Sequence, residues 1–168
     1  MCSVTRQLAT TYFMTMLLVC TGPPSARADD RLSRATLKGI SAVYVVVEDL
    51  PSNAATLGLS RDTIQTDVEL KLRLAGMAVL TEEEGIKPLG AAHIYVNVNF
   101  TDPAVAASIK VALDQNALLE RNGEFAIAVT TWDTNYVIAN PTAQGIRNVI
   151  KDGVDQFLNA WLSVNPKK

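Results

Sequence analysis

The sequence contains few of the residue types from which most enzyme and metal sites are built. It has one histidine, His93, and two cysteines, Cys2 and Cys20, both near the start of the chain. The rest of the chain therefore offers no thiol nucleophile, and any site that needs an imidazole must use His93. Its nine glycines form no glycine-rich phosphate loop. We expect a protein that is not an enzyme, with no catalytic residue, no cofactor and no metal.

A positive charge excess and a long apolar run are also missing. The chain has 15 basic and 17 acidic residues and a pI of about 5.4. This composition gives no basic footprint for a nucleic-acid partner. No run approaches the roughly 20 apolar residues that span a bilayer, so we expect no transmembrane segment in the mature chain.

The first 28 residues have the pattern of a secretory signal peptide. Arg6 supplies the positive charge, residues 12–20 form a short apolar run, and Ala26-Arg27-Ala28 offers small residues to a signal peptidase. Cleavage after Ala28 removes two basic residues and no acidic one, which leaves a net charge of −4. We therefore expect an exported protein, either periplasmic or secreted.

Lipid attachment at Cys20 is the alternative to this interpretation. The residue before it is Val19, where a lipobox requires a small side chain. An ordinary signal peptide is therefore favoured. It would also remove both cysteines, so the mature protein would contain no disulfide.

The mature chain is expected to contain a loose amino-terminal segment, residues 29–38, and a single α/β domain, residues 39–168. The β-branched run at residues 39–47 is typical of a central strand covered on both faces. Ser60 is a good helix N-cap, and Gly76 is a good stop before a second strand at residues 77–80. Strand, helix and strand in this order predict a parallel crossover unit.

An antiparallel meander is expected next. In residues 92–101 the apolar side chains alternate with polar ones, which predicts a strand with one wet face. Two further strands start near Ile109 and Phe125. A three-residue loop, Arg121–Gly123, with a left-handed Gly123 would align Leu113 with Thr131 and put Phe125, Ile127 and Val129 on the inner face.

A long helix closes the chain, because apolar residues recur at three- and four-residue steps from Ile146 to Leu162. The predicted fold class is α+β. It is a two-layer sandwich in which a mixed, mostly antiparallel sheet of about five strands carries two helices on one face, in the order β-α-β-β-β-β-α.

One surface stands out as a candidate partner-contact face. The predicted register puts Trp132 on the outer face of the sheet, near Lys110, and Tyr95 shares that side. Exposed aromatic side chains on a sheet face are plausible anchors for a partner. The alternative is that Trp132 packs under the amino-terminal segment. His93 falls on the same wet face, where a solvated or neighbour-bonded imidazole is the ordinary interpretation.

The element order resembles that of small bacterial envelope α/β domains. It is similar to the amino-terminal domain of the Tol system's periplasmic propeller protein and to lipopolysaccharide-assembly lipoproteins. The runs Ile64–Arg73 and Val154–Asn159 also resemble exported bacterial proteins that are uncharacterised. These resemblances imply an envelope domain of this fold, and no functional residue carries over from them.

Two function hypotheses follow. The first is an exported, non-enzymatic binding or assembly module of the bacterial cell envelope, with an envelope protein or component as partner. The second is a periplasmic small-molecule or lipid carrier, with a pocket between the sheet and the two helices. An enzyme that depends on His93 ranks below both.

The signal-peptide prediction can be tested directly. Expressed with its full leader in an export-competent bacterium, the protein should have an amino terminus at Asp29, because signal peptidase cleaves after the small residue Ala28. Amino-terminal sequencing and intact mass would show this. A chain that begins at an acylated Cys20 would contradict it.

Overall fold

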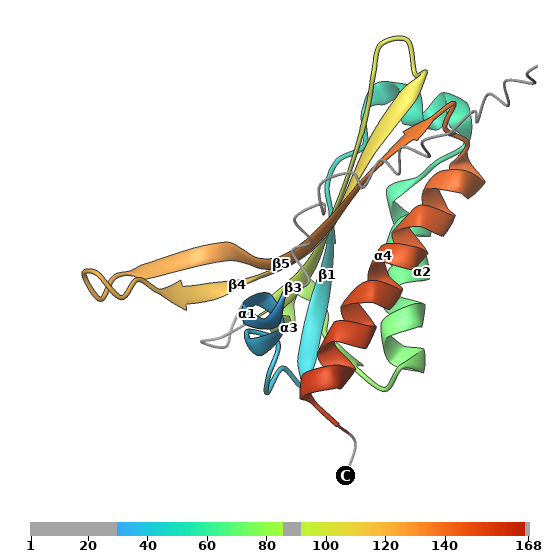
Figure 1. Cartoon of the computed structure of the whole chain (residues 1–168). Helices are drawn as coiled ribbons and strands as arrows, with labels where there is room; N and C mark the ends of the chain where they lie inside the picture. The colour runs from blue at the N-terminus through green and yellow to red at the C-terminus, as the bar shows by residue number, and fades with distance from the viewer. Residues whose placement is uncertain (1–29, 86–91, 167–168) are drawn as a thin grey trace, which may run out of the picture.

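The computed structural model of the chain describes residues 30–85 and 92–166. The predicted signal peptide and both cysteines lie outside the described residues. The fold class is confirmed: a five-stranded mixed sheet in the order β2-β1-β3-β4-β5 carries the helices α2 and α4 on one face (Figure 1). The order β1-α2-β2-β3-β4-β5-α4 matches the predicted one, with three short helical segments added.

The element bounds are as follows. The strands are β1 (Ala42–Val47), β2 (Ala78–Val79), β3 (Ala92–Phe100), β4 (Ala106–Leu118) and β5 (Phe125–Ala139). The long helices are α2 (Arg61–Leu74) and α4 (Ala143–Val164), and the short ones are α1 (Arg31–Ala35), the 3₁₀ helix η1 (Ser52–Leu57) and α3 (Glu82–Gly85). Strand β1 pairs in parallel with β2 and β3, whereas β3–β4 and β4–β5 are antiparallel.

The parallel crossover forms where the sequence predicts it. The Ser60 hydroxyl accepts a hydrogen bond from the Thr63 amide and caps α2. Gly76 takes a left-handed conformation, with φ of +88°, and lets the chain leave the helix. The stripe Ile64, Val68 and Leu72 is fully buried, because it is the face of α2 that lies on the sheet.

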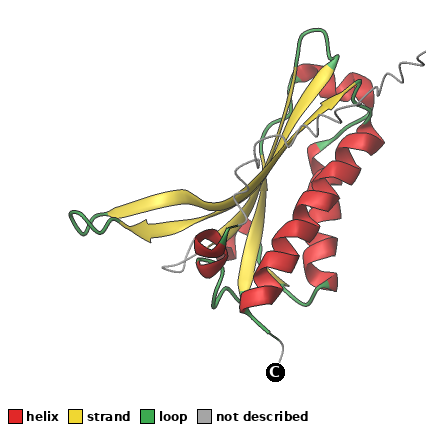
Figure 2. Ribbon diagram, viewed as in Figure 1, coloured by secondary structure: helices red, strands yellow, loops and turns green. Residues whose placement is uncertain are grey.

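Helix α4 is the main cover of the sheet. Its buried stripe, which includes Ile150, Phe157 and Trp161, recurs at the predicted helical spacing. The helix backbone comes close to the sheet at Gly153, where a Cβ would lie 2.8 Å from Cγ2 of Val111 on β4. The two layers of the sandwich are therefore in direct contact at this point. Figure 2 shows the two long helices side by side along one face of the sheet.

Ion pairs join α2 to α4 above the core. The Arg147 guanidinium donates to both carboxylate oxygens of Asp67, at 2.7 and 3.0 Å, and Lys151 lies 3.3 Å from the same group. Lys71 of α2 pairs in turn with Asp155 of α4. The hydrogen bond from Arg147 lowers the pKa of Asp67, so this carboxylate stays ionised in moderate acid.

The amino-terminal segment differs from the loose chain that the sequence suggested. Asp30 and Ser33 form a reciprocal capping box that starts α1. The Leu37 side chain is fully buried in the core. The carbonyl of Leu37 and the amide of Gly39 are both held by the Asn165 side chain, just beyond α4. A buried apolar anchor and long-range hydrogen bonds order this segment.

The β4–β5 hairpin also differs from the predicted register. The Leu119 amide donates to the Glu124 carbonyl, so the loop has four residues, 120–123, rather than three. Gly123 is left-handed, with φ of +70°, as expected. Strand β5 then holds two extra residues at irregularities opposite Gln115–Ala117 and Leu113–Asp114. Phe125 and Ile127, expected inside, are 67% and 81% exposed.

The close approach at Gly153 gives a stability prediction. Gly153→Leu should lower the free energy of unfolding by about 2 kcal/mol or more, because overpacking against Val111 outweighs the helix propensity gained. Urea titration would measure this. Asp152→Leu, one residue away on the exposed side of α4, should change it by less than about 1 kcal/mol. Equal effects of the two variants would contradict the packing argument.

Candidate functional site

The structure does not place the three predicted contact residues on one surface. Trp132 is 1% exposed and lies in the core, on the face of the sheet that α4 covers. Its ring packs edge-on against Phe157, with the ring centroids 5.5 Å apart. The prediction that Trp132 is an exposed partner anchor is therefore wrong.

A bulge explains this error. Asp114 is opposite Thr130, whereas Leu113 is opposite Trp132, so Thr131 is an extra residue on β5. One extra residue reverses the side chains that follow, which brings Trp132 to the face of Leu113. The predicted pairing of Leu113 with Thr131 would have required an unbroken ladder.

Tyr95 and Lys110 do lie on the outer face. Tyr95 is opposite Ala112 and Lys110 is opposite Asn97, so the two are diagonal neighbours on adjacent strands. The Tyr95 hydroxyl donates to the Glu48 carboxylate. Because Trp132 is buried elsewhere, Tyr95 is the aromatic residue that remains of the predicted contact face, and its ring is half-buried.

A polar cluster lies on the same face, around His93. The register puts His93 opposite Asp114, and Nε2 of the imidazole is 3.6 Å from the Asp114 carboxylate. The Thr130 hydroxyl donates to the same carboxylate at 2.6 Å. Within residues 30–85 and 92–166, Asp114 is the one charged or polar residue that is buried. The sequence analysis missed this partner of His93, although antiparallel pairing of residues 92–101 with the next strand could have revealed it.

Tyr44 completes the cluster from β1. Its ring lies 4.9 Å from the His93 ring, and Gly85 of α3 packs so closely on it that a Cβ would meet the ring. Burial lowers the pKa of His93, and the charge of Asp114 opposes this in part. Burial raises the pKa of the Tyr44 phenol, together with the charges of Glu82 and Asp114. At neutral pH both rings are therefore uncharged, which suits a structural cluster.

The most prominent surface feature is the far end of the β4–β5 hairpin, here called the β-arm (residues 116–128). In the described part of the chain, β3 pairs with β4 no further than Ala92 opposite Gln115. Beyond that pair, β4 and β5 continue as a two-stranded ribbon that projects away from α2 and α4 (Figure 1). The ribbon leaves the sheet beside the bulge at Thr131 and the His93 cluster.

The β-arm exposes large apolar side chains. Leu118 is 60% exposed, Phe125 67% and Ile127 81%. Leu118 is directly opposite Phe125, and Ile127 follows two residues later, so the three share one face of the ribbon. We call it the large-residue face. Exposed apolar patches of this kind mark sites of association. The sequence analysis missed it because it placed Phe125 and Ile127 in the core.

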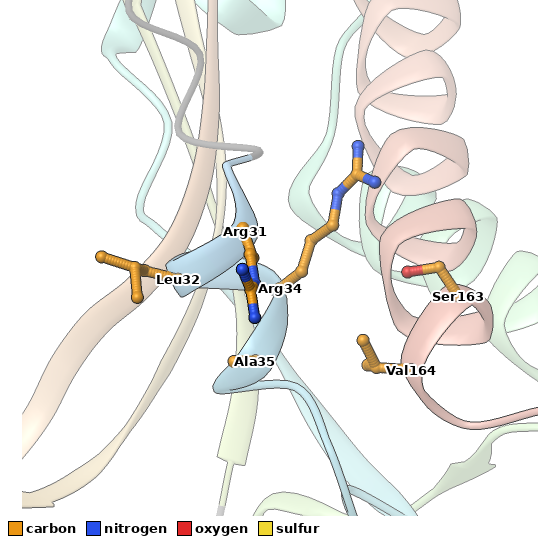
Figure 3. A pocket seen from close by; sticks show the side chains of 6 residues that line it. All are labelled: Arg31, Leu32, Arg34, Ala35, Ser163 and Val164. Carbon is orange, nitrogen blue, oxygen red and sulfur yellow. The ribbon is translucent and has the colours of Figure 1, made fainter.

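A hollow between α1 and the end of α4 is the second feature. It has a volume of about 830 Å³, it is open to solvent, and it is lined by Arg31, Leu32, Arg34, Ala35, Ser163 and Val164. Figure 3 shows the Arg34 side chain extending toward α4, whereas Leu32 points the opposite way. None of its described lining residues carries a carboxylate or an imidazole, so these side chains offer no acid–base group for catalysis.

Neither a metal-binding cluster nor a membrane-spanning helix is present among the described residues. Among the described residues, no group of three or more His, Cys, Asp or Glu side chains is arranged to hold a metal ion. Over the same part of the chain, no helix is both long and apolar enough to cross a bilayer.

The comparisons with known proteins add little. No protein-family model matches the chain, and no curated protein matches it. Among solved structures, the chain is similar to a subunit of a PelC dodecamer from Paraburkholderia phytofirmans. The identity is 12% and the TM-score 0.40, over 74% of this chain and 89% of that one. A similarity this low does not transfer a function, a site or an assembly state.

The His93 cluster predicts a pH dependence of stability. The pKa of His93 is lowered in the folded state, so between the unfolded value of about 6.5 and the lower folded value the unfolded chain binds more protons. The free energy of unfolding should therefore fall as the pH falls through this window. Urea titrations at pH 7.5 and 5.5 would measure the loss, and His93→Gln should reduce it. An unchanged loss in His93→Gln would contradict the assignment.

Proposed function

We propose that the chain is an exported, non-enzymatic binding or assembly module of the bacterial cell envelope, and that the β-arm is its contact surface. The observation that carries the proposal is the large-residue face: Leu118, Phe125 and Ile127 are exposed together on a ribbon that projects from the body. The core does not need these side chains. A partner that covers them would remove this apolar surface from water, which favours binding.

The physics of the ribbon supports the same function. A two-stranded hairpin is at best marginally stable in water when no third strand or helix covers it. The structure holds the β-arm at its base, where the Asn116 side chain accepts a hydrogen bond from the Ala128 amide and Asp114 accepts one from Thr130. Farther out, the described residues hold the ribbon through the β4–β5 ladder and the hydrogen bonds of the tip loop. A partner would complete the packing.

The outer face is a supporting surface in this proposal. Tyr95 and Lys110 lie on it, next to polar neighbours that pair with one another, such as Asn97 with Asn99. Side chains that are already satisfied gain little from a new contact. The outer face therefore contributes orientation rather than affinity.

The carrier hypothesis is less well supported. It requires a pocket between the sheet and the two long helices, yet Gly153 of α4 nearly touches Val111 of β4. The core residues that line this interface, such as Ile64, Ile94 and Phe157, are fully buried. The hollow beside α1 lies outside this interface. A ligand would have to displace core side chains to bind there.

Site-specific photo-crosslinking tests the proposal. The full chain, with its leader, would carry benzoylphenylalanine at position 127 of the β-arm, or at position 159 on the exposed side of α4 as the matched control. In the native host, position 127 should give a discrete protein adduct at several times the yield of position 159. Equal yields at the two positions, or no adduct at 127, would contradict the proposal.

A further inference from the structure

We infer that the partner is a protein with an apolar groove that receives the β-arm and contacts both of its faces. The inference rests on the proposed function and specifies the shape and chemistry of the partner. It follows from the side chains on the two faces of the ribbon, from the apolar area that they offer and from the charges at its tip.

The second face of the β-arm is apolar at the pair nearest its middle and charged only toward the tip, where Glu124 follows. Ala117 is directly opposite Ala126, and because side chains alternate along a strand, both point away from the large-residue face. We call this the alanine face. A hairpin that is solvated on one side normally carries polar residues there. At the pairs Leu118–Phe125 and Ala117–Ala126 neither face has that pattern, and the first charged side chain of the alanine face is Glu124 at the tip, which favours contact on both sides below the tip.

The size of the patch argues against a second copy of the chain as the occupant. At the exposures of Leu118, Phe125 and Ile127, the large-residue face offers on the order of 400 Å² of apolar surface. Two copies joined face to face would bury about 800 Å² in total, which is less than the roughly 1,200–2,000 Å² of a specific interface. A groove that also covers the alanine face would bury considerably more per β-arm.

The tip argues against a lipid surface as the occupant. The loop and its flank carry two carboxylates, Glu120 and Glu124, and one guanidinium, Arg121, all exposed. Insertion of the β-arm into a bilayer would bring these charges in first, at a high desolvation cost. A protein groove that is open at its end leaves the tip in water.

Crosslinking from the two faces tests the inference. Benzoylphenylalanine would be placed at position 118 or 127 on the large-residue face, and at position 117 or 126 on the alanine face, in a strain that also expresses a second copy with a different epitope tag. Both faces should give an adduct with the same protein, identified by mass spectrometry, and this protein should not carry the second tag.

Several results of the crosslinking would overturn the inference. Adducts from the large-residue face alone would show a flat partner, and adducts that carry the second tag would show self-association. Adducts with lipid in place of protein would show a membrane surface. No adduct from any of the four positions would refute the proposed function as well, so the failure of the two proposals can be distinguished.

A charged substitution adds a second readout. With the crosslinker at position 127, Ala126→Arg should lower the adduct yield at least fivefold, because a guanidinium on the alanine face would block an enclosing groove. Asn122→Arg, in the solvent-exposed tip loop, is the matched control and should leave the yield within twofold. A yield unchanged by Ala126→Arg, at an unchanged urea midpoint, would overturn the inference.

Discussion

The packing of α4 on the centre of the sheet is the interaction on which the rest of the molecule depends. Gly153 lets the helix backbone approach Val111, and Phe157 and Trp132 meet edge-on beside that contact. Because α4 lies this close, its ends and flanks reach other parts of the chain: Asp67 of α2 through Arg147, and Ile40 through the Trp161 indole. A single well-packed helix thus orders both the second helix and the amino-terminal segment.

The same packing explains why the β-arm is left uncovered. Helix α4 packs on β4 and β5, and β3 pairs with β4 from Ala107 to Gln115. Among the described residues, neither element continues along the β-arm. The bulge at Thr131 lies where the covered part of the hairpin meets the β-arm. It turns the Trp132 side chain into the core and leaves Thr130 on the outer face, where its hydroxyl donates to Asp114. Trp132, on the sheet side of the bulge, packs against Phe157 in the core. Phe125 and Ile127, on the β-arm side of the bulge, are exposed. The exposed apolar side chains of β5 near the hairpin loop therefore lie on the β-arm side of Thr131.

The His93 cluster is best understood as part of this transition. A buried carboxylate is costly unless it is hydrogen-bonded. Asp114 has Thr130 as a donor and His93 as a close neighbour, at the point where the ribbon leaves the sheet. The arrangement ties β3, β4 and β5 together where β3 begins. The single histidine of the chain thus contributes to the packing of the sheet.

The sequence by itself determined the layers of this protein. The helical period from Ile146 to Leu162, the alternation in residues 92–100 and the Ser60 and Gly76 signals depend on local physics, and each predicted element forms. The tertiary structure alone decided the faces of β5. A bulge is set by the packing of a whole ladder, so no local pattern indicated that Trp132 turns inward while Phe125 and Ile127 stay in water. The candidate site was missed for that reason: its exposure depends on where the pairing of β3 with β4 begins, at Ala92 and Gln115, which is a contact between segments far apart in the chain.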